Sequence, residues 1–469
     1  MELMLSSILA LVVCIALAAK GPLRGLWIFF AVTPLGAAAA FNLPAVGGAS
    51  ILVTDIAALT MFALVVVHRN GPAMIAGTMR FGQPGFWLLL LLLYGTFATL
   101  MFPSVFAGQT EVFSISRAAN ENGVVIVQLR PTAGNLTQLF RLILGVAIFF
   151  ALAVVMKVRS EEQPVLKAMV VATCVNAAIG WIEVASYAVG LPDLMAPLQS
   201  ANYAILADVR MAGLKRMIGG FPEASSFGYF SLGLFAFWFS YWIDTPRSRL
   251  VTAMMLICFV AVLRSTSSGS YVALLAYLGT TMLIWVSMQL RRETDRRGLS
   301  ILVGVLLLCW CLAIIIFASY EYVTPVRDFL DRALFNKLDG ASGVERGSWN
   351  KQAIKNFIDT SGLGAGLGSV RASSWVIATL SSLGVIGAAL FFMFVGSVIL
   401  PTLRRSANDP RMVLARAMAS ACMALVISAT LTSPTPDLSI FFYAFAGIAS
   451  GLTRAVILES MEQSDRKRS

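Results

Sequence analysis

The chain has 469 residues, of which 58% are hydrophobic and only 13% are charged. Runs such as "FWLLLLLLYGTFATLMF" reach the roughly 20 apolar residues that cross a bilayer, so the composition excludes a soluble protein. It also excludes a transmembrane barrel, whose strands would be short and alternating.

Apolar segments recur along the whole chain, which we interpret as a single transmembrane domain, residues 1–469. The predicted fold class is an all-α polytopic membrane protein with about 12–13 transmembrane helices. The predicted spans are residues 3–19, 25–42, 50–67, 84–102, 136–156, 164–190, 224–243, 250–263, 271–289, 299–319, 375–398, 412–432 and 438–456.

The loops between these spans alternate in charge. Short basic loops such as "AAKGPLRG", "MKVRSEEQ" and "RRETDRRG" are typical of the cytoplasmic side. The net charge of +11 therefore favours contact with anionic lipid, and we predict no nucleic-acid partner. The longest loop on the opposite side, residues 320–374, is predicted to face outward, which in a bacterial inner membrane is the periplasm.

The outward loop 320–374 has apolar residues at helical spacing over 326–338 and again over 349–357. We predict two amphipathic helices on the membrane surface, joined by the turn "DGASG". They would cover whatever cavity the spans enclose.

A charged, turn-prone cluster, "RMIGGFPEASSFG", stands before the predicted span 224–243. Gly219 and Gly220 allow a turn, Pro222 suits the first helical position, and Glu223 then falls in the first turn. These residues constitute either a good helix start or a general base beside a phosphate-binding arginine, Arg216. Two further cations, Arg210 and Lys215, precede the cluster.

A second cluster, "RSTSSGSY", begins at Arg264 between two predicted spans. Its hydroxyl groups either bind sugar hydroxyls or satisfy the backbone of a tight helical hairpin.

The third cluster contains "GLGAGLGSVR", in which glycines alternate and Arg371 follows. It is neither a Walker loop nor a dinucleotide fingerprint. Alternating glycines permit close backbone approach to a ligand or to another helix.

Other reactive residues give no metal or cofactor signal. The six cysteines lie in apolar runs, and no His, Cys and carboxylate cluster has metal-ligand spacing, so we predict no metal site and no cofactor. Asp55, Asn176, Glu183 and Arg141 fall in or near predicted spans, where structural pairing within the bundle is favoured over catalysis.

Together, the three clusters resemble those of the O-antigen ligase and Wzy-type polysaccharide polymerase superfamily. The first resembles its signature of arginine, glycine, aromatic, then Glu or Asn, with Arg216 and Glu223 in those places. The third resembles its signature of arginine and tryptophan before a glycine-rich stretch, with Arg346 and Trp349 there. The resemblance covers most of the chain and is concentrated in 210–232 and 345–387.

This resemblance implies a metal-independent membrane glycosyltransferase of the C type that uses a polyprenyl-pyrophosphate-linked glycan as donor. Arg216 and Arg346 would stabilise the charge that develops on the pyrophosphate, and Glu223 would take the proton of the acceptor hydroxyl. Arg210, Lys215, Arg264 and Arg371 are further candidates for substrate binding. A chain-length regulator or export machinery is the implied protein partner.

The ligases of this superfamily carry a functional histidine after the glycine-rich stretch, where this chain reads "VRASSWVIATL". The difference favours the polymerase branch and, within it, the exopolysaccharide polymerases. The alternatives are a ligase that moves the glycan to another acceptor, a peptidoglycan-type polymerase, and a lipid-linked oligosaccharide flippase or transporter.

Overall fold

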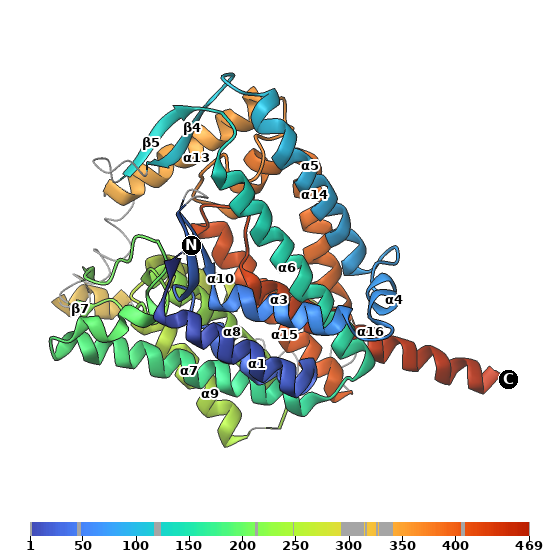
Figure 1. Ribbon diagram of the computed structural model, residues 1–469. Helices are drawn as coiled ribbons and strands as arrows, with labels where there is room; N and C mark the ends of the chain where they lie inside the picture. Colours follow the sequence, from blue (N-terminus) through green and yellow to red (C-terminus); the bar gives the residue numbers. More distant parts are fainter. Residues whose placement is uncertain are drawn as a thin grey trace.

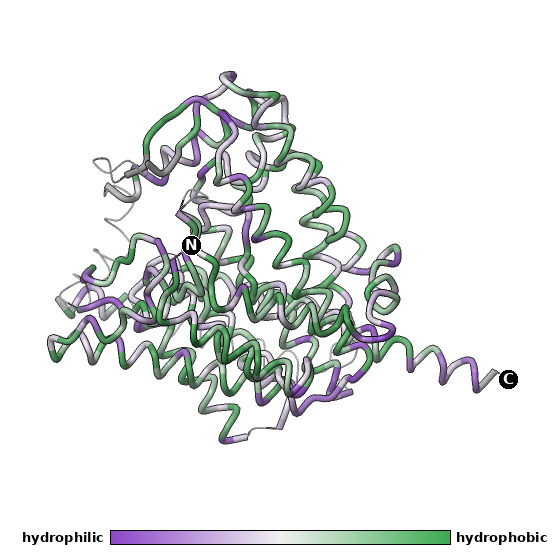
Figure 2. The backbone as a smooth tube through the Cα atoms, in the orientation of Figure 1, coloured by the Kyte–Doolittle hydropathy of each residue, from purple (hydrophilic) through white to green (hydrophobic). Residues whose placement is uncertain are grey.

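The computed structural model describes the chain in segments, which together include most of the predicted spans. Within them, eight helices are long and apolar enough to cross a membrane, and Figure 2 shows hydrophobic residues along most of their length. The chain is therefore a mostly helical polytopic membrane protein. The described residues are 2–44, 48–116, 123–211, 214–246, 248–291, 314, 317–324, 327, 341–404 and 409–468.

The eight long helices form one bundle (Figure 1). In its apolar core, α6 packs along α16, and α15 packs between α8 (Ala224–Asp244) and α16. The hydrophilic end of α16 projects from the bundle. The eight helices are α1 (Leu5–Arg24), α5 (Pro84–Val105), α6 (Ala133–Val158), α7 (Glu162–Ala188), α10 (Ser268–Arg291), α14 (Trp375–Arg404), α15 (Pro410–Thr432) and α16 (Ile440–Arg468).

The predicted span 25–42 is not one continuous helix, although the segment does run from the end of α1 back to its start, where Phe41 pairs with Leu3. Its helix, α2 (Leu26–Val32), has only seven residues, too few to cross a bilayer. Pro34 has no N–H to continue the ladder, and the chain turns and enters strand β2 (Ala39–Leu43) inside the protein. Phe29, Phe30 and Ala38 are fully buried, so the apolar character of this segment reflects burial in the protein.

Three other predicted spans coincide with helices outside these eight. The predicted span 50–67 contains strand β3 (Ala49–Leu52) and the apolar helix α3 (Val53–Val66), whose 14 residues are fewer than those of the eight long helices. The predictions for 224–243 and 250–263 correspond to α8 and to the 16-residue helix α9 (Arg249–Arg264). The predicted span 299–319 lies almost entirely outside the described residues.

The described residues include three small antiparallel sheets at helix ends, none of which was predicted. One contains β1 (Glu2–Leu3), β2 and β3. The second is the hairpin of β4 (Glu111–Ser116) and β5 (Gly123–Gln128), in which Val112 pairs with Val127. The third joins β6 (Arg210–Met211) to β7 (Leu214–Lys215) directly before the first sequence cluster.

The β4–β5 hairpin carries helix α13 (Ala341–Asp359), which begins inside the predicted "DGASG" turn and includes the second predicted amphipathic helix. Figure 1 shows α13 alongside both strands. Asn356 is fully buried, and its amide donates to the Thr110 hydroxyl at 2.9 Å and to the Glu111 carbonyl. These bonds fix α13 at one end of the bundle. The first predicted amphipathic helix, 326–338, lies outside the described residues apart from residue 327.

Candidate functional site

The segment before α8 is held by the turn that follows α2. Gly219 adopts φ +55°, which a glycine accepts without strain. The Gly220 carbonyl accepts a hydrogen bond from the Ala37 N–H at 2.8 Å, and a Cβ at Gly220 would lie 2.5 Å from the Pro34 carbonyl oxygen. The two glycines therefore bring the chain close enough to this turn to fix where α8 begins.

Glu223 is the N-cap of α8, which starts at Ala224. The prediction that Pro222 would be the first helical residue is therefore wrong, because the helix begins two residues later. The Glu223 carboxylate bonds no backbone N–H as a cap; it accepts instead from the Ser225 hydroxyl and remains partly exposed. The carboxylate lies near the positive end of the helix dipole, a favourable place for a negative charge.

Four of the predicted site residues form one charge group: Arg216, Glu223, Arg346 and Arg371. Burial lowers the pKa of the Arg216 guanidinium, the Glu223 carboxylate opposes that change, and the Arg346 charge adds to it. The same causes act in the same directions on the pKa of Arg371. Their charges therefore act on one another, although no ion pair or hydrogen bond joins the four described side chains and they come from a loop, the start of α8, helix α13 and the segment before α14. We call this set the cationic cluster.

Two arginines of the cationic cluster have unused donors. The buried Nε atoms of Arg216 and Arg371 have no hydrogen-bond partner among the described residues. The Arg371 guanidinium lies over the Trp349 ring of α13, 4.5 Å from its centroid, a distance typical of cation–π contact. Buried donors are almost always paired in native proteins, so we expect at each of these two an acceptor that the described residues do not supply.

The glycine-rich stretch contacts other parts of the backbone. All four glycines of 362–368 have positive φ. The Gly366 N–H donates to the Ser382 carbonyl in α14 at 2.9 Å, and a Cβ at Gly368 would lie 2.3 Å from the Gly134 carbonyl oxygen at the start of α6. The sequence left open whether the glycines allow close approach to a ligand or to another helix, and the structure shows close approach to helices. The stretch leads the chain from α13 to Arg371.

The other predicted cations lie around this group in different roles. Arg264 ends α9, and its Nη1 donates to the Lys215 carbonyl at 2.8 Å, which holds the residue next to Arg216. Arg210 is exposed, with its guanidinium 5.8 Å from the Tyr187 ring centroid. Substrate contact by Arg264 and Arg210 thus has less support than contact by the cationic cluster.

Lys215 forms an ion pair with Glu183 of α7, and the two side chains are only 8% and 4% exposed. The second carboxylate oxygen of Glu183 accepts from the Ile218 N–H at 3.2 Å. Glu183 is therefore paired within the bundle, as predicted from the sequence for the polar residues in or near the spans. Because the Lys215 ammonium is paired with Glu183, its role in the structure is to attach the segment before α8 to α7.

We expect Lys215→Met to lower the free energy of unfolding by about 3–5 kcal/mol, because it leaves the Glu183 carboxylate buried without a counter-charge. Lys215→Met/Glu183→Gln removes both charges and should recover most of the loss. Thermal unfolding of the purified protein in detergent measures both, with the exposed Lys351→Met as control. Wild-type stability of the single variant, or no recovery in the double variant, would contradict the structural role.

The hydroxyl-rich cluster after Arg264 is a tight turn between α9 and α10. Ser265, Thr266 and Ser267 are at most 3% exposed. The Ser265 hydroxyl donates to the Val262 carbonyl at 2.7 Å and accepts from the Ser267 N–H at 3.3 Å. These hydrogen bonds satisfy polar groups of the turn's own backbone. The cluster therefore agrees with the second of the two interpretations of its sequence, a tight helical hairpin.

No family model and no curated protein matches this chain. Function is therefore inferred from the geometry of the site and from the resemblance of its motifs. Within the described part of the chain, no group of three or more His, Cys, Asp or Glu residues is arranged to hold a metal ion.

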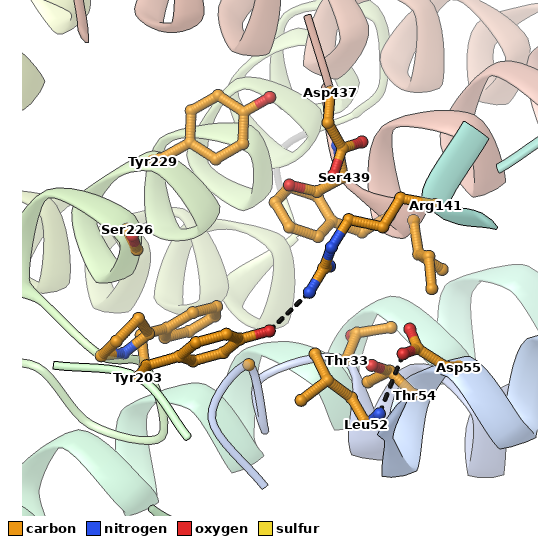
Figure 3. A pocket seen from close by; sticks show the side chains of 15 residues that line it. Thr33, Leu52, Thr54, Asp55, Arg141, Tyr203, Ser226, Tyr229, Asp437 and Ser439 are labelled. Carbon is orange, nitrogen blue, oxygen red and sulfur yellow. Dashed lines mark hydrogen bonds between the residues drawn. The ribbon is translucent and has the colours of Figure 1, made fainter. Parts of the chain in front are cut away.

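A polar cavity of about 210 Å³ lies beside the start of α8, and we call it the polar chamber (Figure 3). Arg141 of α6 extends into it and donates to the Tyr203 hydroxyl. Asp55 of α3 is 2% exposed, and its Oδ2 accepts from the Leu52 N–H at 2.9 Å. The chamber is lined by Thr33, Gly36, Leu52, Thr54, Asp55, Arg141, Tyr203, Phe221, Pro222, Ser226, Tyr229, Asp437, Ser439, Ile440 and Phe441.

The sequence identified only part of this chamber. Asp55 and Arg141 stood out because charged residues are rare in apolar segments. Tyr203 lies in a loop with no motif, and Asp437 precedes α16 in the short segment "SPTPDLS". Only the folded chain brings these residues together, from positions up to about 380 residues apart in the sequence.

Proposed function

We propose that the protein is a polymerase of polyprenyl-pyrophosphate-linked oligosaccharide repeat units, a metal-independent Wzy-like glycosyltransferase. It would act in exopolysaccharide or O-antigen synthesis, in a bacterial inner membrane, with its site on the periplasmic side. The observation that supports this most is the cationic cluster, in which the buried Nε atoms of Arg216 and Arg371 have no partner among the described residues and the Glu223 charge acts on both.

The charge of the cationic cluster suits a diphosphate. Three guanidinium groups and one carboxylate give a net charge of about +2 at neutral pH. Guanidinium groups bind phosphate oxygens through two parallel hydrogen bonds, and such bonds are strongest where water is partly excluded. The apolar spans beside the cluster would hold the polyprenyl chain in the bilayer.

In the proposed reaction, the bond between the anomeric carbon of the donor and the pyrophosphate oxygen breaks. Its electron pair stays on the pyrophosphate, where Arg216 and Arg346 would stabilise the added charge. A hydroxyl oxygen of the acceptor repeat unit forms the new bond to the anomeric carbon, and Glu223 would take its proton. The products are the elongated lipid-linked glycan and the free polyprenyl pyrophosphate.

The orientation and the full span number are also part of the proposal. The basic loops at the ends of α1, α6 and α10 indicate the cytoplasmic side by their Lys and Arg content. The start of α8 and helix α13 would then face the periplasm, with 320–374 as the large loop. Twelve transmembrane helices would complete the topology, with 299–319 among them.

The test is elongation by the purified protein in proteoliposomes that contain lipid-linked repeat units. We expect a ladder of products that differ by one repeat unit, with no nucleotide and no metal ion added, detected by gel electrophoresis and mass spectrometry. Transfer to a different lipid or protein without a ladder would contradict polymerisation and indicate a ligase. Movement of the substrate across the bilayer without elongation would indicate a transporter.

A further inference from the structure

The polar chamber differs from the cationic cluster in its charge. Arg141 is the one cation among its lining residues, and Asp55 and Asp437 are the two carboxylates. Asp55 lies in the first turn of α3, and Asp437 accepts from the Ser439 N–H just before α16, so each carboxylate meets the positive end of a helix dipole. With these contributions the chamber is close to neutral, whereas the cationic cluster is positive.

The charged groups of the chamber are neighbours that do not pair with one another. The charges of Asp55 and Asp437 both act on Arg141, yet neither carboxylate forms an ion pair with it. The second oxygen of Asp55, Oδ1, is buried and has no hydrogen-bond partner among the described residues. Figure 3 shows Asp55 and Asp437 on different sides of the Arg141 side chain, with Tyr203 at its tip.

An occupant of this space must therefore donate to carboxylates and accept from a guanidinium. Because the chamber is close to neutral, it offers neither a free anion nor a free cation the net attraction that the cationic cluster offers a diphosphate. A neutral ring that carries several hydroxyl groups satisfies both requirements, because each hydroxyl donates and accepts. Tyr203, Tyr229 and Phe441 add aromatic surface to the lining, against which the C–H face of a sugar packs.

The chamber is large enough to hold such a ring. Its volume of about 210 Å³ is more than ten times the roughly 10–15 Å³ that a single water molecule needs. Pro222 and Ser226, which stand on either side of Glu223 in the sequence, both line it. The occupant would thus lie beside the backbone of Glu223, the residue that we propose as the general base, although the Glu223 side chain is not among the lining residues.

We propose that the polar chamber is the subsite for one neutral sugar residue of the acceptor glycan. Asp55 and Asp437 accept hydrogen bonds from its hydroxyl groups, and Arg141, held by Tyr203, donates to its oxygens. The sugar's identity as acceptor rests on the proposed polymerase function, whereas binding of a sugar ring in the chamber does not. In this arrangement the cationic cluster holds the diphosphate and the chamber holds the sugar whose hydroxyl attacks.

Two probes separate the two sites. The first is the free oligosaccharide released by mild acid from the lipid-linked repeat unit, which carries no diphosphate, with binding detected by saturation-transfer NMR. The second is inorganic pyrophosphate, with binding measured by calorimetry. We expect Asp55→Asn and Arg141→Gln to weaken oligosaccharide binding about tenfold or more and to leave pyrophosphate binding unchanged. Arg216→Ala should do the reverse.

Further variants guard against general damage to the fold. Ser226→Leu fills the chamber without removing a charge, and should also block the oligosaccharide. Asp193→Asn changes an exposed carboxylate outside the chamber and should bind both probes as the wild type does. Each variant is compared with wild type by thermal unfolding.

The chamber assignment is overturned if the oligosaccharide does not bind the wild-type protein, or if it binds Asp55→Asn, Arg141→Gln and Ser226→Leu equally well. The proposed polymerase function fails separately, through absence of elongation by a wild-type protein that binds the oligosaccharide in the chamber. The two failures therefore give different results in the same set of samples.

Discussion

Alanine at Arg216 or at Arg346 is expected to lower the rate of glycan elongation by about 10²–10³-fold while the protein remains folded. Each guanidinium would stabilise charge that appears on the pyrophosphate only as the sugar departs, so its loss should appear mainly in kcat. Arg216→Lys keeps the charge but loses the paired hydrogen bonds of a guanidinium, and should fall between wild type and Arg216→Ala. The measurement is the rate of ladder formation in proteoliposomes at saturating substrate.

The control for these variants is Lys351→Ala, which removes an exposed cation from α13, five residues beyond Arg346. It should elongate glycan at the wild-type rate. Full activity in both Arg216→Ala and Arg346→Ala would remove the basis for assigning the cationic cluster to the pyrophosphate. Equal losses in Lys351→Ala would indicate a general effect of positive charge on substrate recruitment.

The sequence predicted the long helices well. An apolar run such as residues 84–102 must satisfy its backbone hydrogen bonds internally when it crosses a membrane, and a helix does so. It failed at 25–42, where an equally apolar segment lies inside the protein. Hydropathy does not distinguish contact with lipid from contact with other helices. The proline at position 34 was the available signal that a continuous helix ends there.

The β4–β5 hairpin was also missed, although its sequence carried a signal. The segments "EVFSIS" and "GVVIVQ" contain the β-branched and aromatic residues that strands favour. They lie between the predicted spans 84–102 and 136–156, in a loop for which no structure was predicted. The hairpin matters for function because it supports α13, and α13 positions Arg346 and Trp349 relative to Arg371.

For the candidate site, motifs predicted which residues are close to the start of α8 but not how each is used. Lys215 and Arg216 are adjacent in the sequence, yet the first is paired with Glu183 and the second has a buried Nε with no partner among the described residues. That difference depends on which side chain faces α7, which a single sequence does not specify. The polar chamber depends even more on tertiary contacts, since Tyr203 and Asp437 carry no local pattern.

The two sites together suggest a division of work within the proposed reaction. Glu223 belongs to the cationic cluster by its charge and stands between two chamber residues in the sequence. A base in that position would have the departing diphosphate on one side and the attacking hydroxyl on the other. The N-cap position fixes its backbone, and the Ser225 hydroxyl orients its carboxylate.

Glu223→Gln is therefore expected to lower the elongation rate by about 10²–10⁴-fold, the range that a positioned general base contributes. Glutamine keeps the size of the side chain and the start of α8, so thermal unfolding should be close to wild type. Glu223→Ser separates the two roles of the residue, because serine is a preferred N-cap but no base at neutral pH. It should fold as well as wild type and remain as slow as Glu223→Gln.

The control is Glu345→Gln, which removes an exposed carboxylate whose charge also acts on Arg371, and it should elongate at the wild-type rate. Rapid turnover by Glu223→Ser would reduce Glu223 to a helix-start residue and leave the acceptor hydroxyl without its proposed base.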